Sequence, residues 1–159
     1  MAFDIAASAV VVQDALRAMT TDGRDTFASV EIERPGIPRG EGPSATIQFN
    51  GMRVVGTTLT NPIEVHNLTV RLWRAQNTAG GQSKELEATQ ITSQVLDMLY
   101  GDFTLGAGIR AVDVAGIYGD SIEARFEDED IPTAGGNASY HIADITVPLI
   151  VDSATAFVA

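Results

Sequence analysis

The stretch IEVHNLTVRLWRA, residues 63–75, alternates apolar and polar side chains along its length. In an extended chain Leu68 and Val70 fall on one face, and Arg71 and Trp73 fall on the other. This period of two is typical of a β-strand with one dry face, and it is the clearest strand pattern in the chain.

Trp73 gives the second face of this strand an apolar side chain of its own. A sheet that is apolar on both faces must cover both. Helices of the same chain can do this, and so can a neighbouring subunit, because only two helices are expected. The sequence leaves both alternatives open, and it makes Trp73 a candidate aromatic residue for a subunit interface.

Two helices are expected, over residues 4–19 and from Ser83 to about Tyr100, because apolar residues recur there at helical spacing. Gly23 and Gly101 follow them as stop signals. The expected buried stripes are Ile5, Ala9, Val12, Leu16 and Met19 in the first helix, and Ala88, Ile91, Val95, Met98 and Leu99 in the second.

Further strands are expected on both sides of the second helix. Residues 44–60 hold two apolar runs around Asn50-Gly51, the preferred pair of a type I′ hairpin turn. Pro148 removes a backbone donor, so the last strand is expected at a sheet edge, or bulged there. The remaining strands are expected at residues 27–33, 109–116, 120–127 and 139–151.

This order of helix, strands, helix, strands predicts an α+β fold. We expect a largely antiparallel or mixed sheet with two helices packed on it, in a single domain over residues 1–152. Residues 153–159 are expected to form a C-terminal tail.

Residues 34–43, RPGIPRGEGP, are too rich in proline and glycine for a helix or strand. A loop of this length in a small domain is either functional or a plain connection. Its candidate partner-contacting residues are Pro35, Gly36, Ile37, Pro38, Arg39 and Gly40.

Composition excludes several classes of function. The net charge of −11 opposes wrapping of nucleic acid and non-specific binding to anionic membranes. The absence of cysteine rules out disulfides, thiolate metal sites and a cysteine nucleophile. We expect no signal peptide, since the apolar N-terminus lacks a basic region.

Residues 106–111, GAGIRA, match the dinucleotide-binding pattern G-x-G-x-x-A. That turn requires a strand before it and a helix after it, so that the helix N-terminus holds the pyrophosphate. Here the expected helix comes first and the expected strand second. We therefore expect no nucleotide and no cofactor.

Two further groups of residues are candidate chemical sites. His66 and His141 are candidate bases if a carboxylate lies nearby, although isolated histidines more often pack or face solvent. Residues 127–130, EDED, are interpreted as an acidic turn after a strand, since they lack the spacing of a calcium loop. No metal site and no catalytic residue are assigned.

Residues 83–152 carry a pattern of a different kind, in the order of their elements. A helix ends in YGDF, a glycine-containing link leads to IRAVDVAGIYG, and IEARF and ITVPLIV strands follow. In this order the chain resembles the tail terminator proteins of long, non-contractile-tailed bacteriophages, especially those of actinobacteria. Residues 34–62 do not share the resemblance.

The resemblance implies a structural protein of the virion, assembled in the host cytoplasm, and not an enzyme. Six copies of a terminator form a ring on the head-proximal end of the tail tube. The ring stops tube polymerisation and joins the tail to the head connector. The implied partners are further copies of the chain, the tail tube protein and the connector or stopper, with no membrane.

DNA would pass through such a ring without specific binding, since an acidic lumen repels it. The candidate lumen-facing residues are Glu127, Asp128, Glu129 and Asp130. Two alternatives remain: another neck or tail component, such as a stopper or tube subunit, and a small ligand-binding or enzymatic α+β domain that uses His66 or His141.

Overall fold

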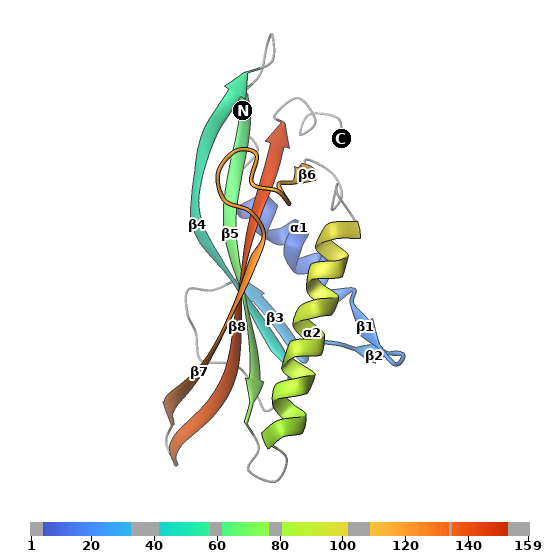
Figure 1. Cartoon of the computed structure of the whole chain (residues 1–159), viewed down its shortest axis with the longest axis vertical. Helices are drawn as coiled ribbons and strands as arrows, with labels where there is room; N and C mark the ends of the chain where they lie inside the picture. The colour runs from blue at the N-terminus through green and yellow to red at the C-terminus, as the bar shows by residue number, and fades with distance from the viewer. Residues whose placement is uncertain are drawn as a thin grey trace.

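The computed structural model describes residues 5–32, 42–57, 62–76, 81–101, 109–133 and 135–152. Figure 1 shows long twisted strands with both helices on one side of them. The elements are α1 (Ile5–Arg17), β1 (Thr20–Thr21), β2 (Arg24–Asp25), β3 (Ser29–Ile32), β4 (Ser44–Thr57), β5 (Pro62–Ala75), α2 (Gly81–Gly101), β6 (Ile109–Val112), β7 (Glu123–Thr133) and β8 (Gly136–Asp152).

A six-stranded sheet has the order β3-β4-β5-β8-β6, and β7 also pairs with β8. Among these pairs β3 and β4 are parallel, and all the others are antiparallel. β1 and β2 form a separate two-stranded hairpin. The expectation of an α+β fold, with a mixed sheet and two helices, is confirmed.

Both helices pack on the same face of the sheet, which we call the helix face. The alternation predicted for residues 63–75 is confirmed, because Leu68 and Val70 are fully buried in the core under the helices. The predicted stripes of both helices reach the same core. Their buried members are Ala9, Val12 and Leu16 from α1, and Ile91, Val95 and Leu99 from α2.

The Asn50-Gly51 pair is not a hairpin turn, contrary to the prediction. β4 runs straight through it, and the register against β5 shifts between Phe49 and Gly51. Gly51 has a φ of 147°, a backbone conformation that side chains disfavour. Glycine there allows a β-bulge, which keeps one long strand where the sequence predicted two.

β7 is also longer than predicted. It continues through the EDED segment to Thr133, with each of its residues paired to β8. The four acids therefore lie on a strand and not in a turn. Charged residues suit this position because β7 is an outer strand, whose free edge they protect from indiscriminate pairing.

Pro148 lies in the central strand of the sheet, although an edge or a bulge was predicted. Pairing of β8 with β7 ends at Thr146, and pairing with β6 begins at Leu149. The carbonyl of Pro148 accepts a hydrogen bond from the Asp113 amide on that same side. The residue without an N–H group thus faces the junction of two neighbouring strands, where the ladder is interrupted.

One stretch of β4 has no partner strand on its outer side in the part of the chain that the structure describes. β3 pairs only with Ser44–Ile47, so the outer edge of β4 from Gln48 to Thr57 is unpaired among the described residues. A second register shift lies between Val54 and Gly56. We call residues 48–57 the free edge of β4.

Candidate functional site

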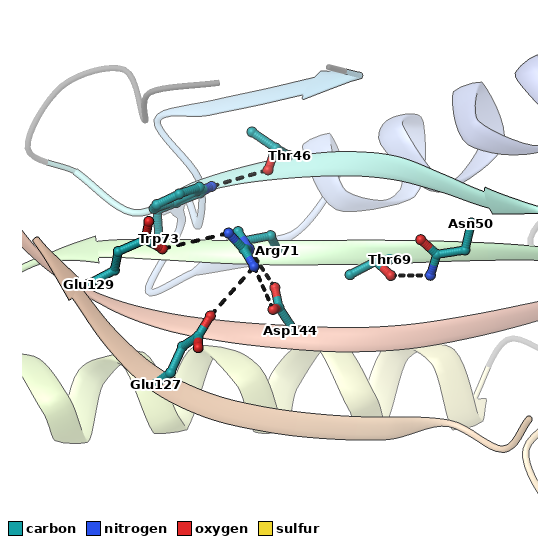
Figure 2. A network of polar contacts seen from close by, with 8 residues as sticks. All are labelled: Thr46, Asn50, Thr69, Arg71, Trp73, Glu127, Glu129 and Asp144. Carbon is teal, nitrogen blue, oxygen red and sulfur yellow. Dashed lines mark hydrogen bonds and ion pairs between the residues drawn. The ribbon is translucent and has the colours of Figure 1, made fainter. Parts of the chain in front are cut away.

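The candidate site lies on the face of the sheet opposite the helices, which we call the open face. Figure 2 looks onto this face, with the helices behind the strands. Arg71 projects from the middle of β5, between Trp73 and Thr69 on the same strand. Acidic side chains reach it from β8 and β7 (Figure 2).

Strand register brings Arg71 and its partners together. Arg71 lies directly opposite Asp144 in the β5–β8 ladder. Its Nε and Nη2 atoms donate to the two carboxylate oxygens at 2.7 and 2.8 Å, a bidentate pair. Glu127 and Glu129 of β7 approach the same guanidinium group at 3.5 and 3.8 Å.

The cluster holds one cation among three carboxylates, so it carries a net negative charge. The hydrogen bond to Asp144 raises the pKa of Arg71 above its ordinary value. Burial opposes this shift, and the negative charges of Asp144, Glu127 and Glu129 reinforce it. Arg71 is therefore a permanent cation that holds acidic side chains from two strands in place.

Trp73 lies next to this cluster and is 3% exposed. Its ring lies edge-on to Tyr140 with 6.0 Å between centroids, its Nε1 donates to Thr46 at 3.1 Å, and Arg71 lies 5.3 Å from the ring centroid. Ile131 and Ile142 complete this buried cluster. The prediction of Trp73 as an interface aromatic is corrected, because an indole already covered within its own chain has no free surface to offer.

The four predicted acidic residues do not share one surface, because a strand alternates. Glu127 and Glu129 lie on the open face, with Arg71. Asp128 lies on the helix face, where it bonds His141 Nδ1 at 2.7 Å, and Asp130 bonds Ser139. At most one of these two pairs can line a given surface.

A second polar cluster lies on the helix face, and it was not predicted as a cluster. Ser8 Oγ lies 2.7 Å from His66 Nδ1, and His66 Nε2 lies 2.9 Å from a carboxylate oxygen of Glu64. If Nε2–H donates to the carboxylate, Nδ1 accepts from the Ser8 hydroxyl, the order of groups found in serine hydrolases.

Burial decides what the Ser8–His66–Glu64 cluster does. Ser8 and His66 are 0% exposed, and Glu64 is 4% exposed. A nucleophile must reach its substrate, and this hydroxyl lies between α1 and β5. The cluster instead ties the helix to the sheet through buried hydrogen bonds. His66 and Glu64 could have been paired from the sequence, since residues two apart on a strand share a face.

His141 also has a carboxylate partner, Asp128. It lines a cavity of about 10 Å³ under α2, with Leu72 and Ile91, which is room for about one water molecule. A larger groove of about 270 Å³ lies between the β1–β2 hairpin and α2. Neither His66 nor His141 lines that groove, so neither candidate base faces a site of that size among the described cavities.

The segment that joins β6 to β7 is held by hydrogen bonds from Asp113 and from β4. The buried Asp113 carboxylate accepts from the amides of Ile117 and Tyr118 at 2.8 and 2.9 Å. Arg53 of β4 donates to the Tyr118 carbonyl. These bonds hold the exposed side chains of Ile117 and Tyr118 close to the free edge of β4.

Several predicted features lie partly or wholly outside the described residues. They include the loop candidates Pro35, Gly36, Ile37, Pro38, Arg39 and Gly40, and the tail at 153–159. Of the G-x-G-x-x-A segment the structure describes residues 109–111, which begin β6. A strand therefore follows the glycines, as predicted.

Within the described ranges, no group of three or more His, Asp or Glu side chains is placed to hold a metal ion. Neither described helix is both long enough and apolar enough to cross a membrane.

Comparison with known proteins gives a likeness of fold. No protein-family model matches the chain, and no curated protein sequence does. A chain from the virion of a native gene transfer agent particle superposes on it with a TM-score of 0.51 at 16% sequence identity. The match covers 94% of this chain and 98% of the other, so the two share their fold over nearly their whole lengths.

Proposed function

We propose that this chain is a structural component of a phage-type virion, and specifically the tail terminator. The observation that carries the proposal is the shared fold with a chain of the gene transfer agent virion, over 94% of this chain. The order of elements in residues 83–152 supports it independently, since it resembles terminators of non-contractile tails.

In this role copies of the chain, six by analogy with the terminators, form a ring at the head-proximal end of the tail tube. One side of the ring ends tube polymerisation, and the other meets the head connector. The contact between neighbours is heterologous, so each copy presents two different surfaces. No catalysis is involved, which agrees with the burial of Ser8 in the only serine–histidine–carboxylate cluster among the described contacts.

Charge suits the passage of DNA. A ring of six would carry six times the chain's net charge of −11. Duplex DNA carries one negative charge per roughly 1.7 Å, so a lumen of like sign lets it slide without holding it. Glu127 and Glu129, or Asp128 and Asp130, would supply that sign.

The test is electron microscopy of lysates from the parent phage or particle with this gene deleted. A terminator deletion leaves overlong tail tubes beside DNA-filled heads without tails, because nothing ends polymerisation. A complementing wild-type copy restores normal tails.

Other outcomes assign other roles. Tails of normal length beside leaking heads indicate a stopper, and the absence of tubes indicates a tube subunit. Intact particles contradict any structural role in the virion and favour the alternative of a small ligand-binding or enzymatic domain that uses His66 or His141.

A further inference from the structure

We propose that neighbouring copies of this chain join sheet to sheet, the free edge of β4 in one copy pairing with the outer edge of β7 in the next. This inference rests on the proposed ring and names the contact that closes it. β4 and β7 both present unpaired backbone outward among the described residues, at opposite sides of the sheet.

The exposed apolar side chains of the sheet support this pairing. Large apolar residues that are exposed occur on only two described strands of the sheet, at Phe49, Met52 and Val54 of β4 and at Phe126 of β7. Their exposed fractions are 43%, 50%, 59% and 58%.

All four side chains project on the helix face. Phe49 lies opposite the buried Leu68, and Phe126 lies opposite the buried Ala143. Met52 lies opposite His66, whose ring bonds Ser8 of α1. Val54 lies opposite Glu64, whose carboxylate bonds the same His66 ring. A sheet that continues from one copy to the next keeps its faces aligned. The two edges would therefore bring their apolar side chains together and remove them from water.

Charge selects the partner edge. Residues 123–133 contain five carboxylates and one arginine, so two β7 edges repel each other. Residues 48–57 contain no acid and one cation, Arg53. Pairing β4 with β7 therefore avoids the repulsion that β7 with β7 would incur. Pairing β4 with β4 would leave Phe126 exposed and close a dimer instead of a ring.

The two bulges of β4 make the contact selective. They leave Gly51–Val54 as the regular part of the free edge, which fixes where a partner strand can pair. The free edge of β4 lies along Pro62–Thr69 of β5, while β7 lies along the first part of β8, which pairs with Thr69–Ala75. The edges are thus staggered, so strands in a closed ring would tilt relative to its axis, as they do in a barrel.

Cysteine cross-linking tests the pairing, because the chain has no cysteine of its own. Met52→Cys and Phe126→Cys are made as separate full-length variants, mixed, and oxidised at the highest soluble concentration. We expect covalent dimers from the mixture and essentially none from either variant alone. A mixture of Val54→Cys and Phe126→Cys tests a pairing register shifted by two residues along β4.

A charge reversal provides an independent readout. Val54→Glu would face the acidic β7 edge, whereas Val54→Lys would complement it. In sedimentation experiments we expect Val54→Glu to weaken self-association about tenfold more than Val54→Lys. Leu86, 60% exposed on α2, is the matched control, and its Glu and Lys variants should associate like the wild type.

Two results would overturn the proposal. Efficient cross-linking of Met52→Cys alone would show a β4–β4 dimer, and no covalent dimer from either mixture would show that these edges do not meet. The deletion experiment is separate. Overlong tubes without these cross-links would support the terminator role and contradict the β4–β7 contact. Cross-links together with intact particles would support the contact and contradict the terminator role.

Discussion

Arg71 holds side chains from three strands in register. It lies on β5, pairs with Asp144 of β8, and draws in Glu127 and Glu129 of β7. Only β8 contacts both of the other strands through the backbone. The guanidinium group is therefore a direct link from β5 to β7 across the strand that separates them.

Replacing Arg71 with methionine should destabilise the protein by about 1–3 kcal/mol, because three carboxylates would be left together without their cation. The measurement is urea unfolding of both proteins at pH 7. Equal free energies of unfolding for the two proteins would contradict this account.

Ser8 gives a second residue-level prediction. Ser8→Ala removes the hydroxyl that bonds His66 Nδ1 in a fully buried position, and should cost about 1–3 kcal/mol of unfolding free energy. Ser93→Ala is the control, since the Ser93 hydroxyl is exposed and bonds only a carbonyl of its own helix. The control should change stability by less than about 0.5 kcal/mol. Equal losses in the two variants would show that the buried cluster adds little.

The sequence predicted the features of single residues that depend on local spacing along one strand. It did not predict contacts that depend on how distant strands and helices pair. The orientation of Trp73 away from Leu68 follows from alternation, and the structure confirms it. The contacts of Arg71 depend on the register of three strands, which no local pattern encodes. The bond between Ser8 and His66 joins a helix and a strand 58 residues apart.

At the level of elements, both helices and most strands were predictable from periodicity. The wrong predictions concern a glycine, Gly51, and the run of charged residues at 127–130. Gly51 allows a bulge as readily as a turn. In the structure β5 pairs with β4 on both sides of Gly51, so the chain continues as one strand with a bulge. The run from Glu127 to Asp130 looks like a loop, but an outer strand tolerates charge on its exposed side chains.

The segment between β6 and β7 should depend on Gly119. This residue has a φ of 140°, and a methyl group there would meet the Arg53 guanidinium. Gly119→Ala should free the segment from β4 and cost about 1–3 kcal/mol. Hydrogen exchange should then rise at Ile117 and Tyr118, whose amides bond Asp113. Gly101→Ala, where a methyl group meets nothing within 4 Å, should leave exchange and stability close to those of the wild type.

At the level of the whole molecule, the split of the acidic run makes the lumen hypothesis testable. Two double variants remove charge from one face each: Glu127→Gln with Glu129→Gln on the open face, and Asp128→Asn with Asp130→Asn on the helix face. If one face lines the channel for DNA, only that variant should slow genome ejection, measured in particles triggered in vitro. Equal effects, or none, would contradict a lumen lined by either pair.

The central position of β8 also governs the order in which the chain can fold. β5 pairs with residues 140–152 from Ile63 to Ala75, and β6 and β7 have no other partner strand in the described sheet. On the ribosome, β4 and β5 emerge early and wait for a strand made near the end of synthesis. Such distant pairings close slowly, since the chain must first bring far-separated segments together. During that interval the β5 edge that later pairs with β8 is open, as is the free edge of β4, and crowded nascent chains would be most prone to aggregate then.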